Sequence, residues 1–391
     1  MKRVAFLLES NQNNWLGGLS YIRNLLKAIL SNPDRRIEPV LLAHPALTSD
    51  FFCGFPTIET VRTNLANHRH PVRLASRAGR RILDRDLTLE WLLRRHRIDA
   101  LSHSFTVGVR SSRASIGWIP DFQHVRMPEL FSRRELNARN SHYLSLVEGS
   151  RRIIVSSNDA LRDFASFAPD AVHKTSVLHF VSAFSDTGAA LTREQVLSRF
   201  EIDRPFFHVP NQFWAHKNHD VIIEALGLLR KRGVAALVLA TGNAIDYRAP
   251  KHLSRLLTRA KELGVEHSFR VLGIITLPEL QALMVNAIAL INPSKFEGWS
   301  TTVEESKSLG LPIILSDIPV HVEQAPPLGR YFRPDSPEDL AELMLTALRD
   351  HDPAMALKAR EDAALNLSER VQRFAMAYEE IASRAIENEC G

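Results

Sequence analysis

Few cysteines and no long apolar stretch occur in the 391 residues of this chain. The two cysteines, Cys53 and Cys390, lie far apart and match no metal-binding or disulfide spacing. A reducing cytoplasm is the simplest compartment for such a chain. No run approaches the roughly 18 apolar residues that a membrane span needs. The first nine residues have a short apolar core without a small-residue cleavage site, which indicates a first strand and not a signal peptide.

Several sequence motifs are also missing. No G-x-G-x-x-G follows a predicted strand, which argues against a dehydrogenase-type dinucleotide site. The tripeptide Asp84-Arg-Asp86 resembles a metal-binding D-x-D, but no strand precedes it, so we interpret it as surface charge. His216 and His219 have the spacing of metal ligands on a helix, but no third ligand is visible. We therefore predict no metal site.

The positive charge is unevenly distributed. The net charge is +5, and residues 62–97 hold ten arginines against the three acids Asp84, Asp86 and Glu90. This stretch is either a solvated helical face or a surface for an anionic membrane or a phosphate-bearing acceptor. Nucleic acid is not expected as a partner, because aromatic residues are sparse there and no nucleic-acid-binding motif is present.

Short apolar runs alternate with amphipathic segments of helix length, which predicts an α/β fold with parallel sheets. The length favours two domains. Two series of strands imply two Rossmann-like domains, at residues 1–190 and 191–366, followed by a C-terminal helix within 367–391 that could cross back to the first domain. The expected strands are 4–9, 38–43, 99–103, 115–119 and 152–156 in the first series, and 205–209, 235–240, 268–272, 287–291 and 312–315 in the second.

Polar and glycine residues follow many of these strands. In open parallel sheets, ligands bind at the carboxyl ends of the strands. This recurrence is a stronger signal for a site than any one residue. The residues concerned are Gly17 and Gly18, His103, Asp121, Gln212 to Lys217, Gly242, Gly273 and Glu297.

Two carboxylates surround an expected helix start in segment 292–317. Glu297 lies on a loop and Glu305 in the following helix, with seven residues between them. A helix N-terminus offers unpaired N–H groups and a positive dipole end, which suit a diphosphate. Two carboxylates beside it suit the hydroxyls of a sugar and of a ribose. The segment therefore predicts the donor site of an enzyme that uses a nucleotide sugar.

The same carboxylates could instead serve the helix itself. Thr301 with Glu304, and Thr302 with Glu305, both match a capping box, and only one box can form. If Thr301 is the N-cap, Glu304 caps the helix and Glu305 is free to meet a ligand. If Thr302 is the N-cap, Glu305 caps the helix instead.

Segment 297–305 resembles the E-x7-E element of retaining glycosyltransferases of family 4, which have the GT-B fold. The resemblance extends, in the same order, over most of the chain. Gly17-Gly18 resemble the glycine-rich first loop, and 119–131 resembles the central segment of the N-terminal domain. Residues 209–219 resemble the loop with the phosphate-binding lysine, and 271–275 the strand end that meets the nucleobase.

The resemblance implies two Rossmann-like domains whose parallel sheets face a central cleft, with the donor in the C-terminal half. Glu297 would hold hydroxyls of the transferred sugar, Glu305 the ribose hydroxyls, and Lys217 would neutralise the diphosphate. Gln212 stands where members often have an arginine, so either Lys217 and the helix end carry more of the diphosphate or an arginine from elsewhere reaches in. The donor would also meet Gly17, Gly18, Gln212, Gly242, Gly273, Ile275, Gly298, Trp299, Ser300, Thr301 and Thr302.

The implied reaction is metal-independent transfer of a sugar with retention, needs no cofactor, and uses the departing phosphate as the base. Polar groups of the N-terminal domain would position the acceptor, and His103 and Asp121 are the candidates, each of which could instead be structural. The acceptor would be a glycan or a lipid-linked intermediate of polysaccharide biosynthesis. We expect a cytoplasmic protein that contacts the inner membrane face through residues 62–97.

Other functions fit the same residues. A nucleotide-sugar epimerase or a phosphorylase could use this fold, and so could a non-catalytic partner protein that binds sugar nucleotides. Product analysis separates the first two from a transferase, and unchanged activity after loss of Glu297 and Lys217 would favour the third. The sequence does not specify the nucleotide, the sugar or the acceptor.

Overall fold

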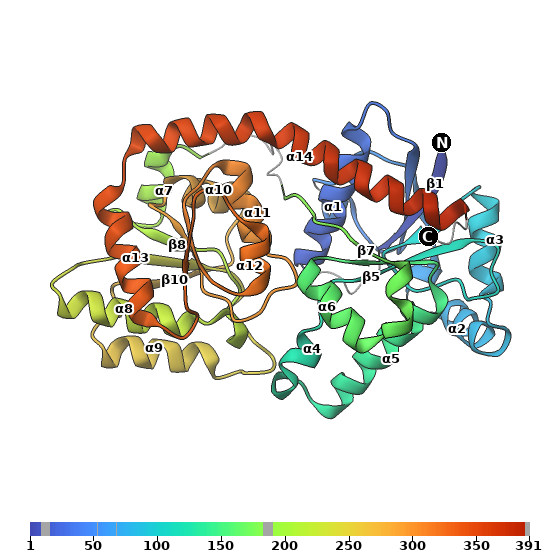
Figure 1. Cartoon of the computed structure of the whole chain (residues 1–391), viewed down its shortest axis with the longest axis horizontal. Coiled ribbons are helices and arrows are strands. Elements are labelled where there is room, and N and C mark those ends of the chain that lie inside the picture. The colour runs from blue at the N-terminus through green and yellow to red at the C-terminus, as the bar shows by residue number, and fades with distance from the viewer. Residues whose placement is uncertain (9–15, 53, 68, 183–190, 388–391) are drawn as a thin grey trace. The chain divides into compact units, whose positions relative to one another are not determined.

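The computed structural model describes residues 1–8, 16–52, 54–67, 69–182 and 191–387 (Figure 1). The chain divides into two compact units. Unit 1 comprises Met1–Val181 with Glu369–Gly391, and unit 2 comprises Ser182–Ser368. Each unit is built around its own parallel β-sheet, so the predicted α/β architecture with two Rossmann-like parts is confirmed.

Unit 1 contains a seven-stranded sheet in the order β3-β2-β1-β4-β5-β6-β7, in which every neighbouring pair is parallel. The chain starts at β1, builds one side through β2 and β3, and then returns to place β4 on the other side of β1. The strand order therefore reverses between β1 and β4. The strands are β1 Lys2–Leu8, β2 Ile37–Ala43, β3 Thr60–Arg62, β4 Ala100–Ser102, β5 Ala114–Ile119, β6 Arg152–Val155 and β7 Thr175–Val177.

Helices surround this sheet. Apolar side chains of α3 pack with those of β1 and β2, and side chains of α5 and α6 pack with those of β5 and β6. The C-terminal part of α14 adds Phe374 and Tyr378 to the interior of the same unit. The helices are α1 Leu16–Ser31, α2 Pro71–Leu83, α3 Leu87–Arg95, α4 Gln123–Arg126, α5 Arg133–Gly149, α6 Asn158–Phe167 and α14 Pro353–Glu387.

Unit 2 contains a six-stranded parallel sheet in the order β10-β9-β8-β11-β12-β13. Here β8 is the first strand, β9 and β10 extend one side, and β11 returns to the other side of β8. The order therefore reverses between β8 and β11. The strands are β8 Phe207–Val209, β9 Val238–Thr241, β10 Phe269–Gly273, β11 Leu290–Asn292, β12 Ile313–Ser316 and β13 Gly329–Phe332.

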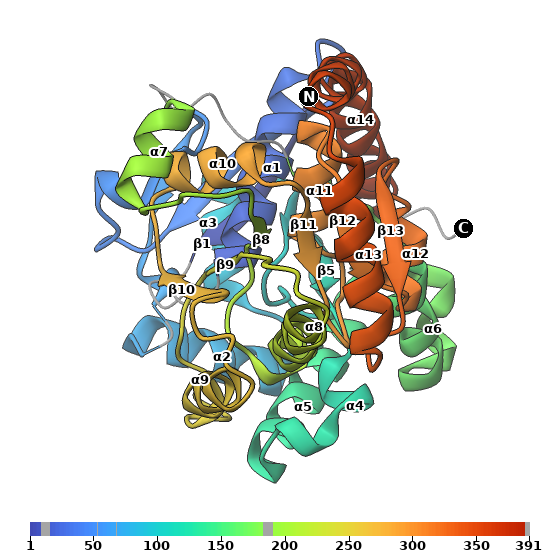
Figure 2. The ribbon, with the colours of Figure 1, turned by 90° about the vertical axis from the view of Figure 1, so that its left-hand side faces the viewer.

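Both faces of this second sheet are covered, which is why its central strands consist of nearly continuous apolar residues. Alternate residues enter opposite layers: Phe207 and Val238 pack towards α8, α9 and α13, while Leu239 and Leu290 pack towards α7, α10 and α11. Figure 2 shows α8 and α9 on one side of the strands and α7 and α10 on the other. The helices are α7 Arg193–Arg199, α8 His219–Lys231, α9 His252–Glu262, α10 Leu277–Asn286, α11 Thr301–Leu309, α12 Pro319–Gln324 and α13 Pro337–Asp350.

Three strands and two helix boundaries differ from the sequence prediction. The strands β3, β7 and β13 were not predicted, because each is a sheet edge of three or four residues without a long apolar run. The last helix begins at Pro353 and not near residue 367, with Asp352 Oδ1 accepting the Ala354 N–H at its start. The first helix begins at Leu16 and not near Leu19, as its apolar pattern had suggested, so Gly17 and Gly18 lie in its first turn.

The described residues contain neither a candidate membrane span nor a candidate metal cluster. In the part of the chain that the structure describes, no helix combines the length and the apolar character that a bilayer crossing requires. Among the same residues, no cluster of three or more histidine, cysteine, aspartate or glutamate side chains could hold a metal ion.

Gly310 is the position where α11 depends most on glycine. It caps α11 with φ +61°, and a Cβ there would overlap the backbone of Ala359 and Arg360 in α14. We expect Gly310→Ala to lower the free energy of unfolding by about 2 kcal/mol, from left-handed strain plus overlap. Gly233→Ala is the matched control, because Gly233 has φ +75° and open space around it, and should cost only about 1 kcal/mol. Urea unfolding of the two variants tests the difference; equal losses would contradict it.

Candidate functional site

Lys217 and Glu297 meet at the point where the strand order of unit 2 reverses. Lys217 follows β8 and Glu297 follows β11, and these strands are neighbours. The Lys217 Nζ lies 2.5 Å from the Glu297 Oε1, and the two side chains are only 14% and 10% exposed. Ligands of open parallel sheets bind at such a reversal, beyond the carboxyl ends of the strands. The structure therefore brings together the two residues on which the predicted site depends.

The charge of Glu297 is maintained against burial. Burial alone would raise the pKa of this carboxyl, but Lys217 opposes that effect and the pKa lies below its usual value. Ser294 Oγ lies 2.7 Å from the same Oε1 and donates a hydrogen bond to it. Glu297 is thus an ionised acceptor group, suited to receive hydrogen bonds from hydroxyls.

The turn that carries Lys217 is fixed by contacts from two other loops. Asn218 adopts φ +59° and donates through Nδ2 to the carbonyls of Pro293, at 3.0 Å, and Pro334, at 2.6 Å. The backbone N–H of Lys295 donates to the His216 carbonyl at 2.8 Å. These bonds tie the lysine turn to the loop that holds Glu297. The position of the ammonium is consequently set before any ligand binds.

Helix α11 starts beside this pair, and its N-cap is Ser300. Ser300 Oγ accepts the Val303 N–H at 3.4 Å and a hydrogen bond from Asn292 Nδ2 at 2.8 Å. The prediction of a capping box at Thr301 or Thr302 was therefore wrong. Thr301 and Thr302 form the first turn, where N–H groups have no carbonyl in a preceding turn. This helix end lies one loop away from Glu297.

The two glutamates of α11 have different neighbours. Glu304 is 1% exposed, lies 3.2 Å from Lys307 Nζ, and accepts a hydrogen bond from Gln324 Nε2 at 3.0 Å. Glu305 is half-buried, and Ser182 Oγ lies 3.5 Å from its Oε1. Since Ser300 is the N-cap, Glu305 is not required to cap the helix. The structural alternative that competed with its ligand role is thereby removed.

A polar network beneath the site was not predicted from the sequence. Asn211 Nδ2 donates to Asn292 Oδ1 at 3.1 Å, and Thr302 Oγ1 donates to Asn211 Oδ1 at 3.3 Å. Gln324 accepts the Ser300 N–H and donates to the Ser300 carbonyl. These buried amides connect β8, β11 and α11. Their signal in the sequence is weak, because asparagine and glutamine near strand ends are common.

Two glycines lie where the base end of the donor site is expected. The Gly242 N–H donates to the Gly273 carbonyl at 2.8 Å, and a Cβ on Gly242 would lie 2.7 Å from the Asn211 carbonyl oxygen. Gln212 therefore lies beside Gly242 and, through it, near Gly273. Ile275 follows Gly273 and is half-buried. Gly298 and Trp299 are half-buried on the loop between Glu297 and Ser300.

A second cation near the lysine turn, Arg248, was not identified from the sequence. Asp246 Oδ2 accepts the Ala215 N–H at 3.1 Å, and its Oδ1 lies 3.4 Å from Arg248 Nε. The Arg248 guanidinium lies 5.3 Å from the centroid of the Trp214 ring, and its side chain is 8% exposed. Asp246 and Arg248 thus fix the start of the turn that ends at Lys217.

The buried histidines of unit 2 are neutral. Burial lowers the pKa of His216 and His219 to about 3 and that of His321 to about 4. His219 stacks on Phe213 at 4.4 Å, and His321 Nδ1 lies 2.9 Å from the Ser316 carbonyl. They act as packing and hydrogen-bonding groups, and not as cations.

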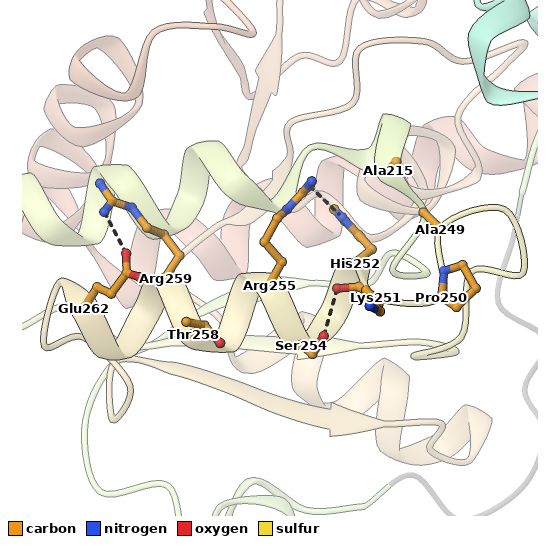
Figure 3. A pocket seen from close by; sticks show the side chains of 10 residues that line it. All are labelled: Ala215, Ala249, Pro250, Lys251, His252, Ser254, Arg255, Thr258, Arg259 and Glu262. Carbon is orange, nitrogen blue, oxygen red and sulfur yellow. Dashed lines mark hydrogen bonds and ion pairs between the residues drawn. The ribbon is translucent and has the colours of Figure 1, made fainter.

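A hollow of about 840 Å³ lies along α9, as Figure 3 shows. It touches the lysine turn through Ala215 only. Its Arg259 is paired with Glu224 at 2.6 Å, and Arg255 lies 3.6 Å from Asp220.

In unit 1, the strand order reverses between β1 and β4, and His103 follows β4. His103 adopts φ +58°, and its ring nitrogens contact Tyr21 OH at 2.8 Å and Ser102 Oγ at 2.7 Å. Burial lowers its pKa to about 3, so it is neutral. It lies among the aromatic rings of Phe6, Tyr21, Trp118 and Tyr378.

Asp121 lies just after β5 and is half-buried. Its Oδ1 accepts the Gln123 N–H at 2.9 Å, and its carbonyl accepts the Tyr143 hydroxyl at 3.1 Å. His124 is buried and its Nε2 lies 3.0 Å from Asn140 Oδ1. Gly17 is exposed at the start of α1, and Gly18 is buried there. Both acceptor candidates thus follow strands of unit 1, as expected.

The pairing of Lys217 with Glu297 predicts a change in acid stability. The pKa of Glu297 is lower in the folded state than in the unfolded state. The ionised carboxyl therefore stabilises the fold at pH values above its unfolded pKa, and this stabilisation is lost as pH falls through its folded pKa. We expect Lys217→Met to destabilise the protein by roughly 3 kcal/mol at pH 7, since Glu297 remains buried without its partner. That loss should shrink as pH falls towards 5, when the carboxyl is protonated. Thermal unfolding over this pH range measures it.

Lys295→Met is the control for this experiment, because Lys295 is an exposed lysine on the Glu297 loop. It should leave both the stability and its pH dependence unchanged. A Lys217→Met variant that loses stability on acidification as the parent does would contradict the pairing.

Known proteins resemble this chain in sequence over part of its length. Residues 194–364 match the family model described as "Glycosyl transferases group 1". The chain is 30% identical over 134 residues to the O-antigen biosynthesis glycosyltransferase WclY of Escherichia coli. That match covers 34% of this chain and 35% of the relative, so it spans about a third of the relative's length.

Solved structures resemble the chain over nearly its whole length. HepE of Anabaena, solved in complex with UDP and glucose, aligns with a TM-score of 0.67 at 16% identity, covering 98% of this chain and 100% of HepE. WaaG, a glycosyltransferase involved in lipopolysaccharide biosynthesis, aligns with a TM-score of 0.57 at 15% identity, covering 99% and 100% of the two chains. At this identity the likeness shows the fold alone. The chain has the GT-B fold, and its residues 194–364 match the family model of the group 1 glycosyltransferases.

Proposed function

We propose that this chain is a retaining glycosyltransferase that moves a sugar from a nucleoside-diphosphate sugar to a hydroxyl of a glycan or lipid-linked acceptor, without a metal ion. The observation that carries the proposal is the buried Lys217–Glu297 pair beside the N-terminus of α11, at the strand reversal of a group 1 glycosyltransferase domain. The family match and the O-antigen relative favour sugar transfer.

In this proposal the donor replaces the internal ion pair. Diphosphate oxygens would take the Lys217 ammonium and the free N–H groups around Thr301 and Thr302. A hydroxyl of the transferred sugar would then donate to the ionised Glu297. Glu305 would accept hydrogen bonds from the ribose hydroxyls, and the glycines after β9 and β10 would leave room for the base. After the ion pair separates, Lys217 thereby gains an anionic partner and Glu297 gains a hydrogen-bond donor.

The chemical step would be promoted by stabilising the leaving diphosphate. Negative charge grows on the diphosphate oxygen as the glycosidic bond breaks, and preorganised donors lower that barrier. Lys217 and the α11 terminus would supply them, so the proposal requires no metal. The departing phosphate would take the proton of the acceptor hydroxyl. This fits the lowered pKa of Glu297 and the pKa of about 3 that burial gives His216, because both groups are then weak proton acceptors.

The acceptor would be positioned by unit 1. Asp121 offers a carboxylate after β5, and the neutral His103 after β4 would position neighbouring groups through Tyr21 and Ser102. WclY and WaaG carry names from O-antigen and lipopolysaccharide biosynthesis, which supports a bacterial surface glycan or its lipid-linked precursor as acceptor. The proposal places the enzyme in the cytoplasm, in peripheral contact with an anionic membrane through residues 62–97.

The donor test starts with uridine diphosphate, because the HepE structures contain UDP, glucose and UDP-glucose. Thermal shifts with UDP, GDP, dTDP and their sugars would identify the nucleotide. With that donor, we expect glycoside formation with retained anomeric configuration, unaffected by EDTA. Lys217→Ala and Glu297→Gln should lower kcat by about 100-fold or more. NMR of the product gives the configuration, and chromatography gives the rate.

Lys295→Ala is the matched control and should keep the parental rate. An epimerised sugar nucleotide, or release of a sugar phosphate, would replace the proposal by an epimerase or a phosphorylase. Binding without turnover, unaffected by either substitution, would favour a non-catalytic sugar-nucleotide-binding protein.

Arg248 provides a further test of donor binding. We expect Arg248→Ala to raise the donor KM roughly tenfold while kcat changes less, because the Ala215–Lys217 turn loses the support of the Asp246–Arg248 pair. Arg248→Lys should recover part of the loss, since it keeps the charge beside Asp246. Arg255→Ala on α9 is the control and should leave KM unchanged. A kcat effect without a KM effect would contradict this role.

A further inference from the structure

Helix α2 exposes its apolar side. Pro71, Leu74, Ala75, Ala78 and Ile82 follow helical spacing and form one stripe, and all five are exposed. Leu74 is 53% exposed and Ile82 80%. A helix that is only a cover for its own sheet would turn such a stripe inwards.

The opposite side of α2 is polar and faces the protein. Arg73 is 6% exposed, and its guanidinium lies 3.2 Å from the centroid of the Phe105 ring. Ser76 is 2% exposed and donates to Asp86, and Arg80 donates to the Thr106 carbonyl at 3.3 Å. These contacts attach α2 through polar groups, and they define which side remains outside.

Helix α3 continues the exposed apolar surface. Leu87 and Trp91, one turn apart, are 54% and 60% exposed, while Leu89 and Leu93 on the same helix are in the core. Only a short turn separates Leu87 from the end of α2, and Figure 1 shows the two helices as neighbours. We call Leu74, Ile82, Leu83, Leu87 and Trp91 together the α2–α3 surface.

The charge around this surface is positive. Arg69, Arg77, Arg95 and Arg97 are exposed, and Arg95 lies 5.5 Å from the centroid of the Trp91 ring. Of the three acids in residues 62–97, Asp86 and Glu90 are buried and bonded to Ser76 and Arg85. Exposed arginines therefore precede, interrupt and follow the apolar side chains along the chain, with Asp84 as the one exposed acid among the described residues of that stretch.

We propose that the α2–α3 surface inserts into the interface of an anionic bilayer, with Leu74, Ile82 and Trp91 in the acyl boundary and the arginines at lipid phosphates. A helix with a strong apolar face and flanking arginines lies in the interface plane in this way. Charge complementarity selects anionic lipid over a second copy of this chain, which would bring the same arginines against each other. Arg73, Arg80 and Arg85 contact Phe105, Thr106 and Glu90 within unit 1. Charge attraction therefore relies on the remaining arginines, and burial of the apolar side chains adds to it.

This inference rests on the proposed function for its purpose only, which is to bring a lipid-linked acceptor to the enzyme. Lipid binding itself needs neither donor nor acceptor. The two proposals can consequently be tested apart.

The experiment is flotation of the full chain with vesicles of phosphatidylcholine alone or mixed with phosphatidylglycerol, at low and at physiological salt. We expect binding to the mixed vesicles, weakened but not abolished by salt. Ile82→Ser should weaken the binding roughly tenfold, because an isoleucine side chain is no longer buried. Arg77→Gln should weaken it about fivefold and reduce the salt dependence. Brominated lipid should quench tryptophan fluorescence, and Trp91→Phe should remove that quenching.

Matched controls come from unit 2. Leu365 is also 80% exposed, so Leu365→Ser tests loss of an exposed apolar residue elsewhere, and Arg193→Gln does the same for an exposed arginine. Both should bind as the parent does. All substituted positions are exposed, and thermal unfolding verifies that each variant folds.

Three results would overturn the proposal. They are absence of binding to the mixed vesicles at low salt, full binding by Ile82→Ser, and a concentration-dependent dimer in sedimentation that Ile82→Ser abolishes. The last would mean that a second copy covers the surface. Nucleotide thermal shifts on the same variants keep the outcomes separate, because a failed donor site abolishes those shifts and leaves vesicle binding intact.

Discussion

The ion pair between Lys217 and Glu297 is the interaction on which the proposed site depends. Two opposite charges lie largely out of water, 2.5 Å apart, and neither would be stable there alone. The surrounding contacts serve to keep them together. Asn218 ties the lysine turn to Pro293 and Pro334, and Ser294 donates to the carboxylate. The sheet brings the two loops that carry these residues together, because β8 and β11 are neighbours at the reversal of strand order.

A suitable ligand can replace the contacts that the two residues make with each other. A ligand with an anionic end and a hydroxyl-bearing end can replace both partners at once, so the cost of separating them is offset within the same site. The start of α11 adds N–H groups where the anionic end would lie, and Asn292 and Gln324 hold Ser300 so that this end does not shift. Fixed position and fixed charge are what stabilisation of a leaving group requires.

The central strands, Lys217 and Glu297 were predictable, because parallel strands buried on both faces leave long apolar runs and polar residues after them stand out. The N-cap was not predictable. Three hydroxyl residues occur in a row, and Ser300 is selected by hydrogen bonds to Asn292, eight residues before it, and to Gln324, 24 residues after it. Arg248 escaped notice for the same reason: its relation to Trp214 exists only in three dimensions. The edge strands were missed because few apolar residues mark them.

Helix α2 shows a different limit of sequence reasoning. Its arginine spacing indicated a basic helical face, and periodicity alone defines the faces of a helix without saying which one is turned inwards. Phe105, Thr106 and Asp86 make that choice, since they offer a ring face, a carbonyl and a carboxylate to Arg73, Arg80 and Ser76. Once those partners hold the polar side, the apolar side has to remain outside. The same arginines that suggested a charged surface thus create an apolar one, and only the arginines at its rim remain available to an anionic partner.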